Sequence, residues 1–173
     1  NRKQLKILKN RISVAGDSAG GNISAVVAQR SVNKVHAPQA QLLLYPALDF
    51  KSRHPSFHAY KEGLVLTGTD VDFVTQYYAE THQVELDDPI ISPTYGQHDK
   101  LPPAFVITAG HDVLHDEGEI YAYKLRHRGV KVHYQEYIDQ AHGFVNLTPI
   151  SSRAKKYVIE ISKNYRKFWD KHA

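Results

Sequence analysis

The chain has 173 residues, of which 42% are hydrophobic, so it is long enough for one globular domain with a sizeable core, and we do not expect a second domain. Its net charge is +4, but no aromatic platform or recognition motif accompanies the basic residues, so we expect no nucleic-acid partner. The chain contains no cysteine, which excludes disulfides and thiolate metal sites. No apolar run approaches the roughly 20 residues that span a bilayer, so we expect a soluble, cytoplasmic protein.

The two ends of the chain carry most of the excess positive charge. Residues 1–11 and 151–173 each have the pattern of a helix with a basic, solvated face. The sequence contains no methionine, whereas a primary translation product begins with one. We therefore expect these residues to be the C-terminal part of a longer protein, a proteolytic product or the ordered part of one.

Short apolar runs alternate with helical patterns along the chain. Strands are predicted over residues 11–15, 39–48, 103–110 and 130–138, and helices over residues 19–32, 69–82 and 116–129. Residues 49–68 and 87–102 contain several prolines and are predicted to be irregular. Alternating strands and helices with nearly continuous apolar strands predict an α/β fold, in which a parallel sheet is covered by helices on both faces.

A serine between two glycines marks the first junction of strand and helix. Gly16, Ser18 and Gly20 match G-x-S-x-G, in which a tight turn makes the serine hydroxyl project from the sheet and glycines avoid collisions. The pattern alone arises by chance in about one chain in twenty of this length. Its position between strand 11–15 and a helix is more specific. We interpret Ser18 as a nucleophile and the N–H of Ala19 as a donor to an oxyanion.

A serine nucleophile requires a base and an acid that orients the base. Asp112 follows the strand over residues 103–110, and His142 follows the strand over residues 130–138. Both lie at the C-terminal ends of strands, at the sheet edge where Ser18 also lies and where open α/β folds bind ligands. We therefore predict that Asp112 is the acid and His142 the base.

Two other carboxylates compete with Asp112 for the orienting role. Asp116 begins a helical pattern and is better explained as a helix cap. Asp139 is close to His142 in the sequence and ranks third.

Two pairs of histidines have the spacing of metal ligands on a helix. His111 and His115 are four residues apart beside acidic residues, but the segment between them is predicted to be a loop. His54 and His58 lie in an irregular segment, where solvated histidines are the better interpretation. We expect neither a metal ion nor an organic cofactor.

Several blocks of sequence resemble the hormone-sensitive-lipase-like esterases of the α/β-hydrolase superfamily. In the family's order, they are GDSAGGN at 16–22, LLYPALD at 43–49, SPTY at 92–95, LPPAFVITAGHDVLHDEGEIYAYKL at 101–125 and HGFVNL at 142–147. The resemblance implies the C-terminal half of an α/β-hydrolase fold in a single, partial catalytic domain. It also implies that Ser18, Asp112 and His142 form the catalytic triad, as their positions had suggested.

The chain departs from this family in two places. Val113 stands where the family usually has a proline, so we expect a modest loss of rigidity in that loop. The family's upstream His-Gly-Gly-Gly segment, which supplies oxyanion donors, has no match here. Because the family places about half of its sheet and an N-terminal cap before the serine, we expect strand 11–15 to lack a sheet neighbour.

The resemblance implies hydrolysis of short-chain acyl esters through a serine acyl-enzyme. We predict low activity for these residues alone, since each missing oxyanion donor typically contributes about 3 kcal/mol to catalysis. Four aromatic residues are candidates for lining an apolar substrate site: Tyr45, Phe57, Tyr60 and Phe144.

Two alternative functions use the same fold. One is a ligand-binding receptor with a degraded triad, against which the retention of all three triad residues argues. The other is an amidase with the same triad, which the sequence leaves open. Members of this family often pair through the last strand and final helix. Strand 130–138, with its alternating apolar residues, is therefore a candidate edge for a homodimer.

Overall fold

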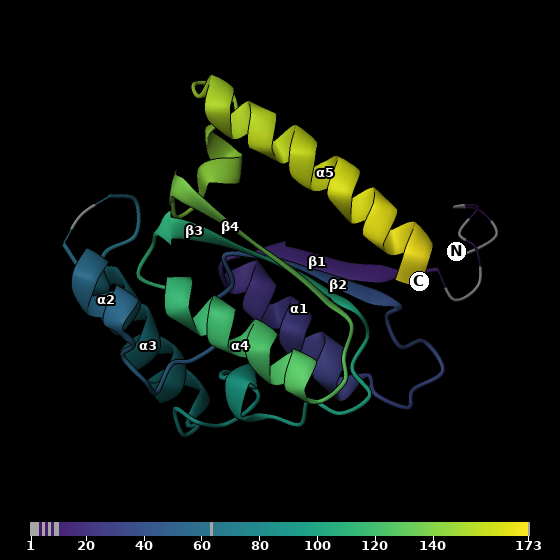
Figure 1. Cartoon of the computed structure of the whole chain (residues 1–173). Coiled ribbons are helices and arrows are strands. Elements are labelled where there is room, and N and C mark those ends of the chain that lie inside the picture. The colour runs from purple at the N-terminus through teal and green to yellow at the C-terminus, as the bar shows by residue number, and fades with distance from the viewer. Residues whose placement is uncertain (1–3, 5, 7, 9–10, 63, 173) are drawn as a thin grey trace.

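A computed structural model describes residues 4, 6, 8, 11–62 and 64–172. Four parallel strands form one sheet in the order β1-β2-β3-β4. The strands are β1 Ser13–Asp17, β2 Ala40–Leu44, β3 Ala104–His111 and β4 Val132–Ala141. Helices α1 (Ala19–Arg30) and α4 (His115–His127) cover one face, and α5 (Ser152–His172) crosses the other (Figure 1). The predicted α/β fold with a parallel sheet is therefore confirmed.

The strand boundaries differ from the prediction where the backbone makes a turn. β2 ends at Leu44 and not at residue 48, because Tyr45 adopts a positive φ of 35° and Pro46 has no N–H to donate. β4 continues to Ala141, past an irregularity in its pairing with β3. Both features lie at the C-terminal edge of the sheet.

Helices α2 and α3, which follow one another in the chain between β2 and β3, lie beyond this edge of the sheet (Figure 1). Helix α3 (Gly68–His82) begins at a capping box, in which Asp70 and Thr67 each accept a hydrogen bond from the other's backbone N–H. Helix α2 (Pro55–Tyr60) lies in a segment that was predicted to be irregular, and that prediction is wrong. Pro55 begins this helix instead of breaking it, since the first helical position needs no N–H donor.

The other segments follow the sequence more closely. Residues 87–102 contain only the short 3₁₀ turn η1 (Pro93–Tyr95), and a second turn, η2 (Phe144–Leu147), follows β4. The predicted C-terminal helix is confirmed as α5, whereas the helix expected over residues 1–11 lies mostly outside the described residues.

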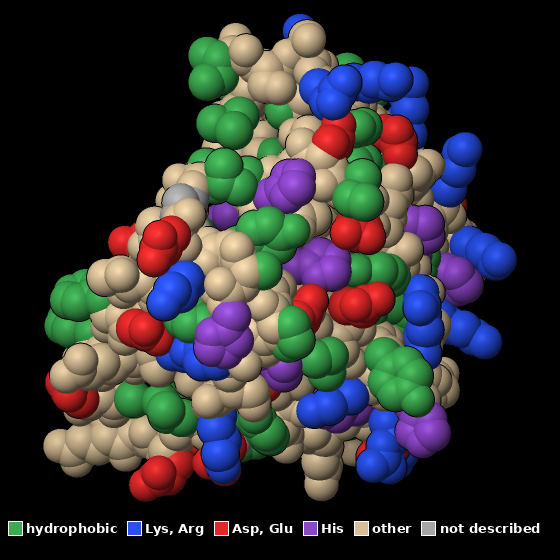
Figure 2. All heavy atoms as spheres, turned by 60° about the vertical axis from the view of Figure 1, so that its left-hand side comes forward, with side chains coloured by type: hydrophobic (Ala, Val, Ile, Leu, Met, Phe, Trp, Pro, Cys, Tyr) green, Lys and Arg blue, Asp and Glu red, His purple; other side chains and the backbone are tan. Residues whose placement is uncertain are grey.

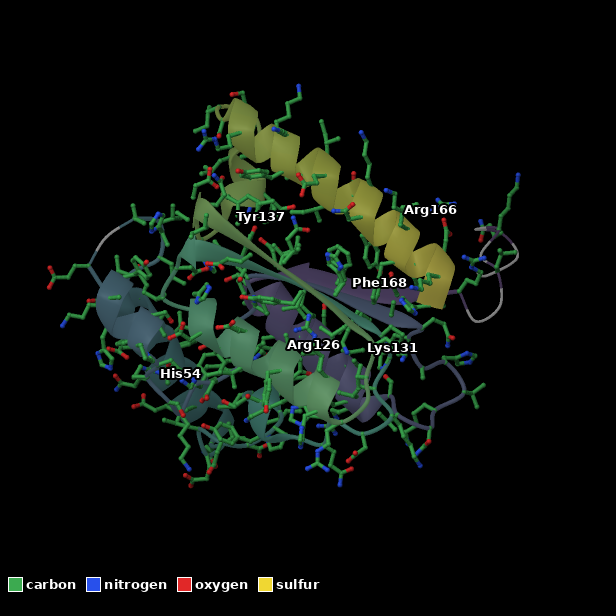
Figure 3. All side chains as sticks on the ribbon, in the orientation of Figure 1. His54, Arg126, Lys131, Tyr137, Arg166 and Phe168 are labelled. Carbon is green, nitrogen blue, oxygen red and sulfur yellow. The ribbon has the colours of Figure 1, made fainter. Side chains whose placement is uncertain are left out.

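The core has one part on each face of the sheet. Under α1 and α4 it contains Leu43, Val106, Tyr121 and Leu125, among other buried residues. Under α5 the core is largely aromatic, and Figure 3 shows Tyr137 and Phe168 between this helix and the sheet. Among the described residues, β1 pairs only with β2 and β4 only with β3. Within the same residues, none of the helices is long and apolar enough to span a bilayer.

Candidate active site

Ser18 lies between β1 and α1 in a strained backbone conformation, with φ 52° and ψ −119°. Strand β2 and the loop after it hold this conformation in place. The N–H of Ser18 donates to the carbonyl of Leu44 at 2.9 Å, and its own carbonyl accepts from the N–H of Ala47 at 3.2 Å. The hydroxyl therefore projects from a turn whose backbone is fixed on both sides.

The glycines around Ser18 have different steric roles. A Cβ at Gly16 would lie 2.1 Å from the carbonyl oxygen of Gly20, so only glycine fits there. The prediction of a collision at Gly20 is wrong, since a Cβ at that position would lie 3.8 Å from the side chain of Asp17, an ordinary contact distance. The second constrained position is Gly21, where a Cβ would lie 2.7 Å from that of Pro46.

The structure brings Ser18, His142 and Asp112 together. The Nε2 atom of His142 lies 2.8 Å from the Oγ of Ser18, and its Nδ1 lies 2.7 Å from the Oδ2 of Asp112. The other carboxylate oxygen of Asp112 accepts the N–H of Leu114 at 2.9 Å, which fixes the acid against its own turn. With its proton on Nδ1, His142 donates to Asp112 and accepts the hydroxyl proton of Ser18.

Asp112 and His142 are both shielded from water. The side chain of Asp112 is 0% exposed and that of His142 is 10% exposed. Charges interact more strongly in such an environment, since little solvent screens them. The arrangement can therefore accept a proton from Ser18 and stabilise the resulting imidazolium.

The two competing carboxylates lie elsewhere. Asp116 does not cap its own helix, so that prediction is wrong; its Oδ2 accepts the N–H of Ser56, in the first turn of α2, at 2.8 Å. Asp139 accepts the hydroxyl of Tyr157 at 3.1 Å. Among the described residues, neither carboxylate makes a hydrogen bond to His142.

The paired histidines have partners of their own. His115 lies between the carboxylates of Asp116 and Glu136, at 2.8 and 3.2 Å. The ring of His111 packs edge-on against Tyr60, with 5.5 Å between centroids. His54 lies 3.1 Å from the carboxylate of Asp49, and the ring of His58 packs edge-on against Phe57. Across the part of the chain that the structure describes, no three His, Asp or Glu side chains are grouped to hold a metal ion.

Tyr45 and Phe144, two of the four aromatics predicted to bind substrate, pack in the core next to His142. The ring of Tyr45 packs edge-on against His142 with 4.9 Å between centroids, and Phe144 packs against Tyr45 at 5.6 Å. Burial raises the pKa of Tyr45, and its hydroxyl donates to Asp17 at 3.4 Å. Both aromatic side chains are fully buried in the core under α5.

The other two aromatics, Phe57 and Tyr60, belong to a small cluster that joins α2 to the turn after β3. Val113, which stands where the resembling family usually has proline, is buried in the same cluster. Its side chain packs this turn against α2, which supports the loop that carries Asp112.

A pocket of about 130 Å³ opens beside Ser18 and Ala19. None of the four predicted aromatics lines it. Its apolar walls include Phe50, Leu66, Val71 and Val74, and its carboxylates are Asp49, Asp70 and Glu117. Sequence reasoning missed these residues, although the spacing of Val71 and Val74 on a predicted helix was a usable signal.

Figure 2 turns the side with α2 and α3 toward the viewer. Histidine side chains gather near the middle of this face, with acidic side chains beside them. The pocket combines apolar walls with the carboxylates of Asp49, Asp70 and Glu117, as is typical of small-molecule sites.

Comparison with known proteins places this geometry in a family context. The α/β-hydrolase-fold family matches residues 1–146. The chain is 40% identical over 146 residues to the carboxylic ester hydrolase LipN of Mycobacterium tuberculosis, covering 81% of the chain and 39% of that protein. It is 31% identical over 160 residues to the ethyl acetate hydrolase of Pseudomonas putida, covering 91% of the chain and 50% of that protein.

A solved structure agrees with these relatives. The esterase of Pyrobaculum calidifontis superimposes with a TM-score of 0.88 at 35% identity, covering 97% of this chain and 56% of the esterase. The chain spans about half the length of the relatives that it matches. The resemblance seen in the sequence is confirmed: the chain belongs to the hormone-sensitive-lipase-like esterases of the α/β-hydrolase superfamily.

Proposed function

We propose that the protein hydrolyses carboxylic esters through a serine acyl-enzyme, with Ser18 as nucleophile, His142 as base and Asp112 as the orienting acid. The continuous hydrogen-bond chain from Ser18 through His142 to buried Asp112 is the observation that carries this proposal. The named ester hydrolases among the relatives support it.

In the proposed mechanism, the Oγ of Ser18 attacks the ester carbonyl while Nε2 of His142 takes the hydroxyl proton. Asp112 keeps the imidazole in the tautomer that can accept this proton. The protonated imidazole then donates to the leaving alcohol, which leaves an acyl group on Ser18. A water molecule then attacks the acyl group while the same imidazole takes one of its protons, and the imidazole passes this proton to the leaving Oγ of Ser18, which releases the carboxylic acid and the free serine.

The attack of Ser18 on the ester carbonyl creates a negatively charged oxygen, which requires hydrogen-bond donors to stabilise it. Ala19 is the first residue of α1, so its N–H is among those that lack an acceptor within the helix. We propose that it supplies one donor, and that a segment preceding residue 1 in a longer protein supplies the others. The 173 residues alone are then expected to be at least about a hundredfold less active than that protein, since one such donor is typically worth this much in kcat.

The pocket beside Ser18 favours small substrates. Its volume of about 130 Å³ and its walls of valine, leucine and phenylalanine suit a short acyl or alkyl group. One relative is named for ethyl acetate, a short-chain ester. We therefore propose short-chain acyl esters as the substrate class.

The experiment compares wild type with Ser18→Ala in the full-length protein, using p-nitrophenyl acetate and a fluorophosphonate probe. We expect wild type to hydrolyse the ester and to be labelled at Ser18, and the variant to do neither. Ser162→Ala, which changes an exposed serine on α5, is the matched control and should behave as wild type. A wild-type protein that binds short esters without labelling would favour a receptor.

An amidase remains the second candidate, because the same triad cleaves both bond types. Matched ester and amide substrates with the same acyl group separate the two functions. We expect the ester to react faster by several orders of magnitude.

Two further expectations concern the protein as a whole. Ile138 on β4 is 72% exposed, and β4 is an edge strand of the described sheet. We propose this edge as the site of a homodimer, to be tested by sedimentation of wild type and Ile138→Lys. The proposed cytoplasmic location is tested by cell fractionation.

A further inference from the structure

Glu117 is a buried acid that the proposed mechanism does not use. It lies in the first turn of α4, five residues after Asp112, and is only 6% exposed. Its Oε1 accepts the backbone N–H of Leu48 at 2.5 Å. Burial raises the pKa of Glu117 well above its usual range, and the nearby carboxylates of Asp49 and Asp112 add to this effect.

The segment that Glu117 binds also holds the nucleophile. The N–H of Ala47 donates to the carbonyl of Ser18 at 3.2 Å, and the side chain of Asn22 donates to the carbonyl of Ala47 at 2.7 Å. The residue next to Ala47 is Leu48, whose N–H is bound by Glu117. Two consecutive residues thus connect the strained backbone of Ser18 to the first turn of α4.

The turn that leads into α4 carries the proposed acid of the triad, Asp112. Asp112 binds the N–H of Leu114, and α4 begins at the following residue. His142 must meet Asp112 at 2.7 Å and Ser18 at 2.8 Å simultaneously. Because both contacts depend on the spacing of the two outer residues, a small shift of the Leu48 segment against α4 lengthens one of them.

We propose that Glu117 is a positioning residue for ester hydrolysis, whose hydrogen bond to Leu48 sets the spacing between the segment that holds Ser18 and the helix start that follows Asp112. This inference rests on the proposed esterase function. The length of the side chain and its capacity to accept a hydrogen bond carry the effect. A negative charge is not needed for it.

A simpler role for an acid in the first turn of a helix is to stabilise the helix dipole. Glu117 differs from such a residue, because its carboxyl group is buried and bound to a different segment of the chain. Glu119, two residues further along α4, is exposed and provides the matched control. Glu117 also lines the pocket, so its effects on kcat and KM have to be separated.

The experiment compares Glu117→Gln, Glu117→Asp and Glu119→Asp in the full-length protein. Glutamine keeps the length and the acceptor, so we expect kcat within about threefold of wild type. Aspartate is one methylene shorter and cannot reach Leu48 without a shift, so kcat should fall by about tenfold or more. We expect KM to stay within about twofold of wild type, and fluorophosphonate labelling of Ser18 to slow in parallel with kcat.

Each other outcome overturns the inference. Glu117→Asp with wild-type kcat and labelling shows that the spacing does not depend on this hydrogen bond. Glu117→Gln impaired as strongly as Glu117→Asp shows that glutamine does not replace the acid. A Glu117→Asp protein that unfolds, or that changes in KM alone, assigns the residue to stability or to substrate contact. Inactive wild type would instead reject the proposed ester hydrolysis, which distinguishes the two failures.

Discussion

The C-terminal edge of the sheet and the face covered by α5 differ in composition and in backbone strain. The edge holds buried polar side chains, including Asp112, His142 and Glu117. It also holds Ser18 and Tyr45, two residues other than glycine with positive φ. Each of these features is unfavourable for folding unless the surrounding structure compensates for it.

The face under α5 is packed by aromatic rings. Phe105 of β3 is fully buried and lies 5.5 Å from the ring of Tyr165 and 5.4 Å from that of Phe168. Rings in such edge-on contacts bury a large apolar area. We therefore expect burial of apolar side chains under α5 to offset the unfavourable free energy of the strained, polar site at the C-terminal edge of the sheet. Substitutions in the two regions should therefore separate activity from stability.

The largest effect is expected from Ser18→Ala at the polar edge. Removing the hydroxyl removes the proposed nucleophile, so kcat should fall by about 10⁴-fold or more. The free energy of unfolding should change by less than about 1.5 kcal/mol, since only one hydrogen bond to His142 is lost. Ester turnover and urea unfolding of the same preparations test both statements. A large loss of stability would show that the edge also carries the fold.

The converse effect is expected from Phe168→Ala under α5. Phe168 is 8% exposed, and Figure 3 shows it between α5 and the sheet. Deleting the ring should lower the free energy of unfolding by about 3–4 kcal/mol, because transfer and cavity terms add. The kcat of the folded variant should match that of wild type. Lys167→Ala, at an exposed neighbouring position, is the control and should change neither quantity.

The two regions also differ in how far the sequence predicted them. Apolar runs and helical spacing predicted all four strands and the helices that cover the sheet, since burial imposes a period on the sequence. The residues of the proposed triad were selected because each follows a strand and carries a side chain that the proposed chemistry requires. Ser18, Asp112 and His142 therefore needed no knowledge of distances to be selected.

The pocket and its supports were not predicted, because they depend on contacts between distant segments. Glu117 resembles an ordinary helix-start acid in the sequence, yet it binds Leu48, 69 residues earlier. Gly21 is constrained by Pro46, which follows a different strand. Tyr45 looks like a candidate for substrate contact, but a positive φ turns its ring against His142. Such pairings become visible only once the strands are placed side by side.

A pH-dependent difference is expected from Glu117→Gln at the polar edge. Because burial raises the pKa of Glu117 in the folded protein, the unfolded chain loses this proton first, near the usual value of about 4.3. Wild-type stability should therefore fall as pH rises from that value toward the raised pKa, by up to about 1.4 kcal/mol per pH unit. Glutamine does not titrate, so the variant should gain stability over wild type with rising pH.

Thermal unfolding across the acidic and neutral range measures this difference. Glu119→Gln serves as the control, because Glu119 is exposed on the same helix. Its difference from wild type should be independent of pH. A constant difference for Glu117→Gln as well would mean that the pKa of Glu117 is the same in the folded and unfolded protein, which would contradict the raised pKa.

The smallest effect is expected from Arg166→Ala on the outer side of α5 (Figure 3). Arg166 donates to Asp170 at 2.9 Å, but both side chains are at least half exposed. Solvent screens such a pair, and an arginine that precedes its acid by four residues opposes the helix dipole, so the loss should be about 0.3 kcal/mol or less. Urea unfolding at low and high salt tests this, since screening should remove even that difference. A loss comparable to that of Phe168→Ala would mean that the outer charges of α5, and not its buried rings, hold the helix on the sheet.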